Sequence, residues 1–155
     1  MRPDFAFFGQ KDAQQVIVIK RLVRDLALKT EVVVTPIVRE ESGLAMSSRN
    51  SYLSDQERRA ATALNRALIN AAAAFDDGER SASRLLEIAR ATIDEEPLAR
   101  IDYISINDAE TLEPIDRIED SPALLSLAAF VGQSRLIDNI VLGKTKKQDA
   151  AGANG

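Results

Sequence analysis

The sequence contains no cysteine and no histidine. Without cysteine the chain can form no disulfide, offer no thiolate nucleophile and build no cysteine-based metal site. Without histidine it can build neither a serine-histidine-aspartate hydrolase triad nor a histidine-ligated zinc site. A magnesium site made only of carboxylates stays possible, but no residue is predicted as a metal ligand.

Long apolar runs are missing as well. No segment approaches the ~18 apolar residues of a membrane span, and the start "MRPDFAFFGQ" lacks the apolar core of a signal peptide. The formal net charge of −4 argues against nucleic-acid binding, because nucleic-acid binders neutralise phosphates with clustered lysine and arginine. We therefore expect a cytoplasmic protein that binds neither membranes nor nucleic acids.

The first part of the chain has the pattern of a β-α-β unit. The apolar "FAFF" (5–8) predicts a buried strand, apolar residues three and four apart predict a helix over 11–28, and the β-branched "EVVVTPIV" (31–38) predicts a second strand ending at Pro36. Such a crossover implies parallel strands. Because two strands do not make a stable domain, residues 1–38 are interpreted as part of a larger core.

The second part predicts a small α+β domain over residues 54–143. The capping box "SDQE" (54–57) starts an alanine-rich helix that Gly78 ends, and a second helix over 81–95 stops before Pro97. A strand over 100–106 and a hairpin around "GQS" complete two helices and a three-stranded antiparallel sheet. Residues 39–53 are predicted as a connecting loop, and the tail 144–155 has little reason to fold.

Two stretches carry candidate chemistry, and the first is "GQKDAQQ" (9–15). A strand that ends in Gly9 and feeds a helix presents free amides, which favour an anion. Lys11 adds a positive charge, Asp12 could accept from ribose hydroxyls, and Gln15 could donate to a carboxylate or a hydroxyl. The alternative is an ordinary capped helix start, with Asp12 as a favourable first-turn charge.

The second stretch is "GLAMSSRN" (43–50). The hydroxyls of Ser47 and Ser48 and the guanidinium of Arg49 could surround phosphate oxygens, since arginine binds them through two parallel hydrogen bonds. The thioether of Met46 could lie against a flat apolar base. The alternative is a plain connector rich in serine and asparagine.

Taken together, "FFGQKDAQQ", "PIVREESGLAMSSRNSYLS" and "RLIDNIVL" resemble the pantoate–β-alanine ligase family, over nearly the whole chain up to Leu142. The resemblance implies an α/β Rossmann-like nucleotidyl-transferase core with a smaller C-terminal domain closing over it. It also implies the reaction: ATP and pantoate give pantoyl adenylate and pyrophosphate, and the amine of β-alanine then releases AMP and pantothenate. Mg²⁺ accompanies the ATP, and the parent enzyme would be a homodimer.

Position by position, the resemblance assigns roles to the same two stretches. Lys11 would stabilise charge on the phosphates, Asp12 would hold the ribose, and Gln15 would bind pantoate. Gly9 and Gln10 would line the ATP site through close backbone approach. The remaining residues assigned to ATP are Val38 and Met46 near the adenine, and Ser47, Ser48 and Arg49 in a flexible phosphate-binding loop analogous to "KMSKS" of class I aminoacyl-tRNA synthetases.

One departure from the family is large. Its His-x-Gly-His signature is absent, because the chain has no histidine, and the first strands of the Rossmann-like core are absent too. We therefore expect a C-terminal portion of the enzyme: a core remnant (1–38), a hinge and phosphate-binding loop (39–53) and a lid (54–143), inactive alone. The alternatives are a stand-alone nucleotide-binding or regulatory module and a structural interaction domain.

Overall fold

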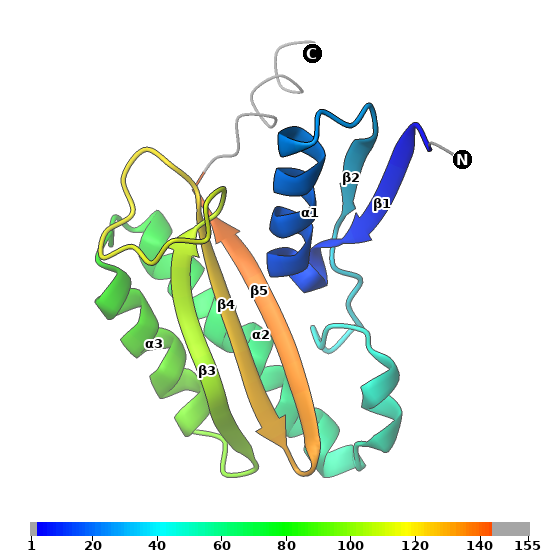
Figure 1. The fold of residues 1–155 in the computed structure, drawn as a ribbon. Coiled ribbons are helices and arrows are strands. Elements are labelled where there is room, and N and C mark those ends of the chain that lie inside the picture. The colour runs from blue at the N-terminus through cyan, green and yellow to red at the C-terminus, as the bar shows by residue number, and fades with distance from the viewer. Residues whose placement is uncertain (1–2, 144–155) are drawn as a thin grey trace, which may run out of the picture.

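The computed structural model describes residues 3–143, and its N-terminal part is the β-α-β unit expected from the sequence (Figure 1). Strands β1 and β2 pair in parallel, with Phe7 opposite Val33. The helix between them buries Ala13 and Val16. The elements are β1 (Phe5–Gly9), the 3-10 helix η1 (Gln10–Asp12), α1 (Ala13–Asp25) and β2 (Glu31–Thr35).

The second part is an antiparallel sheet of order β3-β4-β5, with two helices on one of its faces (Figure 1). This confirms the predicted α+β arrangement. Its elements are the 3-10 helix η2 (Ser48–Tyr52), α2 (Asp55–Asp76), α3 (Ala82–Asp94), β3 (Ala99–Asp108), β4 (Ala123–Val131) and β5 (Ser134–Leu142).

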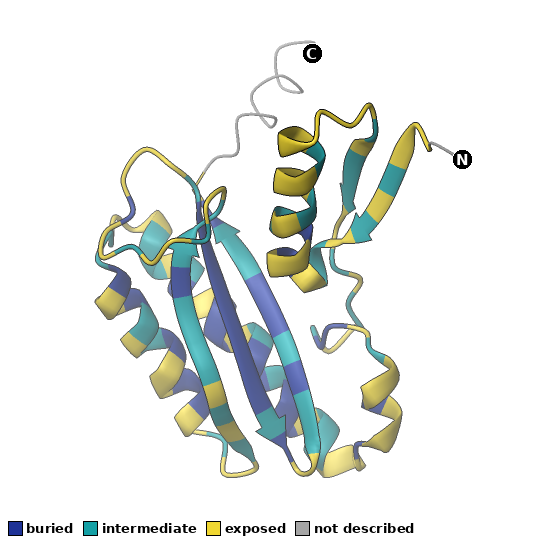
Figure 2. Cartoon of the chain, in the orientation of Figure 1, coloured by how far each residue is buried: buried dark blue, intermediate teal, exposed yellow. Residues whose placement is uncertain are grey.

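The core lies between these two helices and the sheet. Its largest fully buried side chains include Leu64, Leu68, Leu85, Ile93, Leu125 and Leu127. The central strand β4 is buried along almost its whole length (Figure 2). The capping box that starts α2 is present: the Glu57 amide donates to the Ser54 hydroxyl at 3.2 Å, and the Ser54 amide donates to the Glu57 carboxylate at 2.8 Å.

The N-terminal unit leaves large apolar side chains uncovered. Phe5 and Phe7 on β1 are 56% and 68% exposed, and Val18 and Leu22 on α1 are more than half exposed as well. Two strands and one helix cannot bury both faces of such a sheet. The unit therefore exposes apolar surface on both β1 and α1.

Three sequence predictions differ in detail from the structure. The helix expected from Lys11 opens as the 3-10 helix η1 and ends at Asp25, and the second strand ends at Thr35, one residue before the predicted end at Pro36. The expected loop 39–53 contains the 3-10 helix η2. The side chain of Ser47 caps this helix by accepting a hydrogen bond from the Arg49 amide. The predicted unfolded tail 144–155 lies outside the described residues. Among residues 3–143, no helix combines the length and the apolar character that a membrane crossing requires.

Candidate functional site

The loop after β1 brings four of the predicted site residues to one end of the β-α-β unit. Gly9 is in extended backbone with φ −77° and ψ 136°, and a Cβ added there would meet no atom within 4 Å. No contact within the described chain therefore demands glycine at this position. Asp12 stands at the N-cap of α1, where its carboxylate accepts no capping hydrogen bond, and it lies in the first turn of η1. The alternative in which Asp12 is a favourable first-turn charge therefore stays open. Asp12 and Gln15 are both exposed.

The segment that follows β2 folds back on itself as a small hairpin. The Met46 amide donates to the Val38 carbonyl and the Glu40 amide to the Leu44 carbonyl, both at 2.9 Å. The turn requires Gly43, whose φ is +88° and whose added Cβ would collide with the Asn65 side-chain amide. The hairpin places Val38 and Met46 side by side, 65% and 55% exposed. This adjacent apolar pair is available to a flat ring.

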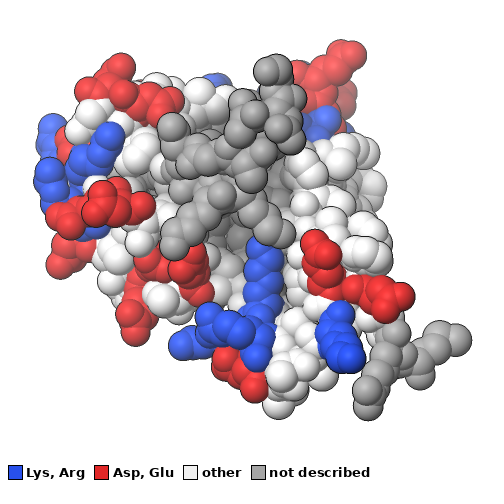
Figure 3. Space-filling view, turned by 90° about the horizontal axis from the view of Figure 1, so that it is seen from above, with Lys and Arg blue, Asp and Glu red and all other residues white. Residues whose placement is uncertain are grey.

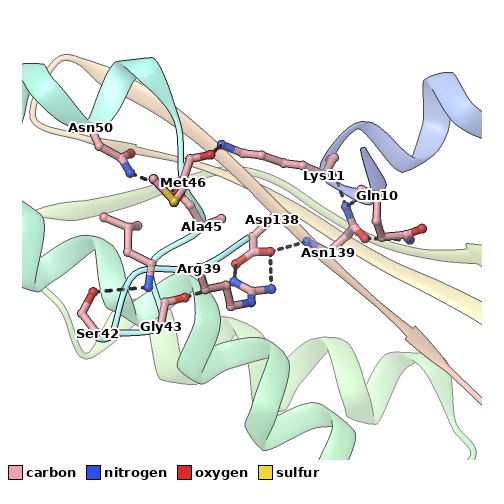
Figure 4. Close-up of polar contacts among 11 residues, drawn as sticks. Gln10, Lys11, Arg39, Ser42, Gly43, Ala45, Met46, Asn50, Asp138 and Asn139 are labelled. Atoms are coloured by element: carbon pink, nitrogen blue, oxygen red, sulfur yellow. Dashed lines mark hydrogen bonds and ion pairs between the residues drawn. The ribbon is translucent and has the colours of Figure 1, made fainter. Parts of the chain in front are cut away.

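Lys11 joins the two segments. Its ammonium donates to the Met46 carbonyl at 3.0 Å (Figure 4). A lysine ammonium carries three donors, so two stay available for a ligand. Burial lowers the pKa of Lys11 below 10.5; the carboxylates of Asp138 and Asp12 oppose that shift, and the positive charge of Arg49 adds to it. Lys11 and Arg49 are therefore close enough to repel each other.

The predicted phosphate-binding residues lie at the start of η2. The Ser47 hydroxyl accepts from the Arg49 amide at 3.2 Å and so caps this short helix. The guanidinium of Arg49 is exposed, and it donates to the Arg135 carbonyl of β5 at 3.2 Å. Ser48 is exposed too. The segment is thus an ordered turn of 3-10 helix beside β5 rather than an irregular loop.

In the part of the chain that the structure describes, Lys11 and Arg49 differ from the neighbouring cations in having no carboxylate partner. Arg39, Arg58 and Arg135 each form an ion pair, with Asp138 at 2.7 Å, Glu40 at 2.7 Å and Asp102 at 2.9 Å. Within residues 3–143, no carboxylate lies within 4.0 Å of the Lys11 ammonium or the Arg49 guanidinium. Elsewhere the two signs of charge are interspersed on the face seen in Figure 3. Because no carboxylate in this range pairs directly with either cation, the remaining donors of both side chains are available to an anion.

Sequence reasoning missed two site residues on β5, Asp138 and Asn139. Both are buried, at 3% and 5% exposure. Asp138 accepts two hydrogen bonds from the Arg39 guanidinium, and Asn139 bonds to the loop that carries Gln10 and Lys11 (Figure 4). The sequence feature that could have indicated them is a pair of adjacent polar residues in the middle of the apolar "RLIDNIVL".

A cavity of about 190 Å³ opens between the start of α1 and the antiparallel sheet. Its walls are Lys11, Asp12, Ala13, Gln14 and Gln15 on one side and Tyr103, Ser126, Ile137, Asp138 and Asn139 on the other. Burial raises the pKa of Tyr103, so its hydroxyl stays a neutral donor. A larger hollow of about 530 Å³ over α2 contains none of the predicted site residues. We therefore place the candidate site at the smaller cavity.

The lowered pKa of Lys11 makes the stability of the chain depend on pH. Below its folded-state pKa, Lys11 is charged in both states and the penalty of burying that charge is fully present. As pH rises from that pKa toward 10.5, the unfolded chain binds more protons, so the unfolding free energy of the wild type should rise relative to Lys11→Met. A ¹³C NMR titration of the Lys11 side chain and urea unfolding at several pH values check this. A Lys11 pKa at or above 10.5, with parallel stability curves, would contradict it.

These elements define a class: a two-part α/β protein in which a β-α-β unit and a helix-covered antiparallel sheet enclose a small polar cavity. Lys11 lines this cavity, whereas the predicted residues Val38, Met46, Ser47, Ser48 and Arg49 lie outside its lining. The family model for pantoate-beta-alanine ligase matches residues 1–141. The chain belongs to the pantoate-beta-alanine ligase family. This membership confirms the resemblance carried by the three sequence motifs.

Individual relatives agree. The pantothenate synthetase of Pelotomaculum thermopropionicum is 55% identical over 144 residues, which are 93% of this chain and 51% of the relative. The Heliobacterium modesticaldum enzyme of the same name is 53% identical over 92% of this chain and 50% of its own length. The chain thus spans about half the length of the curated relatives it matches, in keeping with the expected C-terminal portion.

Solved structures support the fold. Pantothenate synthetase from Thermus thermophilus superposes with a TM-score of 0.79 at 40% identity, covering 89% of this chain and 49% of that one. Pantoate-beta-alanine ligase from Francisella tularensis, solved with beta-gamma ATP and beta-alanine, gives a TM-score of 0.58 at 28% identity, covering 90% and 44%.

Proposed function

We propose that this chain supplies the ATP-binding part of a pantoate–β-alanine ligase. In the proposed reaction, a carboxylate oxygen of pantoate attacks the α-phosphorus of ATP and pyrophosphate leaves. The amine of β-alanine then attacks the carbonyl of the mixed anhydride, forming the amide bond of pantothenate as AMP leaves. Family membership supports the overall ligation, and the adenylate step follows from the resemblance.

The observation that carries this proposal is that Lys11 and Arg49 have no carboxylate partner within residues 3–143. Nucleotidyl transfer depends mainly on positioning and on positive groups placed where charge develops. Lys11 comes from the β-α-β unit and Arg49 from η2 beside β5, so a polyphosphate between them would be held from two elements. Closure of residues 54–143 as a lid would then assemble the site.

The other predicted roles fit around this pair. The exposed side chains of Val38 and Met46 would pack on the adenine, and Asp12 would accept from the ribose. Ser47 and Ser48 would add donors to the phosphates, and Gln15 at the cavity wall would donate to pantoate. By the family resemblance, Mg²⁺ would accompany ATP as part of the substrate.

The remaining half of the enzyme would cover the apolar surface of the β-α-β unit. The exposed Phe5 and Phe7 are suited to packing against further strands or helices of a Rossmann-like core. The complete enzyme, which would be a homodimer by the family resemblance, would provide the His-x-Gly-His signature and the first strands of the Rossmann-like core. We expect the isolated chain to be inactive for that reason.

A chimaera tests the proposed function. The half of the Pelotomaculum thermopropionicum relative that this chain does not match is fused ahead of this chain, and pantothenate formation from ATP, pantoate and β-alanine is measured with AMP and pyrophosphate. We expect turnover by the chimaera and none by the chain alone. A folded chimaera without turnover would contradict the proposal, as would turnover that yields ADP and phosphate.

Gly9→Ala separates ligand binding from folding. Because its backbone is ordinary and an added Cβ meets nothing within the chain, the substitution should change the unfolding free energy by no more than about 1 kcal/mol. A methyl group at the point of nucleotide approach should raise the KM for ATP about tenfold in the chimaera. Thermal unfolding and steady-state kinetics measure the two effects. An unchanged KM for ATP would remove Gly9 from the site.

A further inference from the structure

Asn139 makes three hydrogen bonds to the loop that carries Lys11. Its side-chain Nδ2 donates to the Gln10 carbonyl and to the Lys11 carbonyl, each at 3.0 Å. Its Oδ1 accepts from the Gln10 side-chain amide at 3.2 Å. Asn139 itself lies in the middle of β5 and is only 5% exposed. A single side chain therefore satisfies two backbone carbonyls and one side chain of the candidate ATP loop (Figure 4).

These bonds are the polar link between the two parts of the protein. Within the described chain, every hydrogen bond between residues 3–35 and residues 54–143 ends on Asn139. No ion pair joins those two ranges. Among the described residues, the hydrogen bonds that hold η1 against the antiparallel sheet therefore all involve this one amide.

The preceding residue acts on the other side of the same strand. Successive side chains of a strand point to opposite faces. The carboxylate of Asp138 accepts hydrogen bonds from both Nη atoms of Arg39, at 2.7 and 2.9 Å. Arg39 also donates to the Gly43 carbonyl at 3.1 Å, which holds the hairpin that presents Val38 and Met46. Strand β5 therefore fixes the loop of Lys11 on one face and this hairpin on the other.

We propose that Asn139 is a positioning residue for the ATP site: it sets the place of Lys11 relative to Met46 and Arg49 by holding the carbonyls of Gln10 and Lys11. The inference rests on the proposed function for the identity of the ligand. The side chain must be an amide, because the two carbonyls need donors and the Gln10 amide needs an acceptor. A carboxylate of the same shape would face two carbonyl oxygens with no proton to donate.

Three variants remove different numbers of these hydrogen bonds, and a fourth variant serves as a control. Gln10→Met removes one bond, Asn139→Ala removes all three, and Asn139→Asp keeps the shape while abolishing both donors. The control is Thr92→Val, which removes the buried hydroxyl that accepts from Asn70 at 3.0 Å between α2 and α3. Thermal unfolding shows whether the control loses as much stability as the other variants. If one Asn139 variant does not fold, the other alone is enough for the test.

Two readouts separate positioning from folding. In the chain alone, hydrogen exchange of the amides of residues 10–13 should accelerate in the order of bonds lost and stay unchanged in the control. In the chimaera, the KM for ATP should rise about tenfold or more in both Asn139 variants, with a smaller rise for Gln10→Met and none for the control. The hydrogen-exchange measurement does not require an active enzyme. An inactive wild-type chimaera would therefore contradict the proposed function, while the exchange rates would still test the role of Asn139.

Two results would overturn the inference. The first is wild-type exchange at residues 10–13 and a wild-type KM for ATP in folded Asn139 variants. The second is equal acceleration and an equal rise in KM for Thr92→Val, because the effect would then follow from lost stability rather than from the position of the loop.

Discussion

Replacing Lys11 by methionine is expected to lower kcat/KM of the chimaera about 100- to 1,000-fold, the loss typical of removing one preorganised donor aimed at developing charge. Methionine keeps the length and most of the apolar stem of lysine, so packing should be preserved. Folding should not suffer, because the variant no longer buries part of a charge whose pKa burial already lowers. Steady-state kinetics with ATP as the varied substrate measure the effect.

Lys20→Met is the matched control. Lys20 lies on the same helix, α1, and is exposed, so its replacement should leave kcat/KM within about twofold of wild type, as surface substitutions usually do. If Lys11→Met retained wild-type kcat/KM, or if Lys20→Met lost as much, the assignment of Lys11 to the phosphates would be wrong.

The second large effect is on stability. Asp138→Asn is expected to lower the unfolding free energy by about 3 kcal/mol, because it leaves the Arg39 guanidinium without its anion inside the protein. The side chain of Asp138 is 2% exposed and that of Arg39 is 28% exposed, so water compensates little. The same change should lower the pKa of Lys11 further, since Asp138 is the strongest group that raises it. Urea unfolding and the NMR titration of Lys11 measure both effects.

Asp102→Asn gives a comparison at an exposed pair. Asp102 pairs with Arg135 at 2.9 Å, with side chains 37% and 40% exposed, and surface pairs of this kind contribute about 0–1 kcal/mol. A loss for Asp138→Asn no larger than that for Asp102→Asn would show that the buried pair does not hold the hairpin in place.

Much of the fold could be predicted from local patterns. The β-α-β unit is predicted by two short apolar or β-branched runs with a segment of helical periodicity between them. Helix α2 is predicted by its capping box and by Gly78 after its last turn. These signals work because each acts over a few residues. The same locality explains the miss at residues 48–52: the Ser47 cap that forms η2 is indistinguishable in sequence from a polar loop.

The site could be predicted only in part. Gly9, Lys11, Met46 and Arg49 stand in two recognisable stretches, and the structure brings Lys11 into contact with Met46 and near Arg49. The partners that hold them could not be predicted, because Asn139 lies 129 residues from Gln10. Pairing over such a separation depends on the register of the sheet and on how the two parts meet, neither of which a single sequence specifies.

In the proposed site, Lys11 and Arg49 bind one polyphosphate between them. A crystal structure of the chimaera with Mg²⁺ and a non-hydrolysable ATP analogue tests it most directly. We expect phosphate oxygens within hydrogen-bond distance of both the Lys11 ammonium and the Arg49 guanidinium, with the base against Val38 and Met46. A nucleotide bound with its phosphates away from either cation would contradict it.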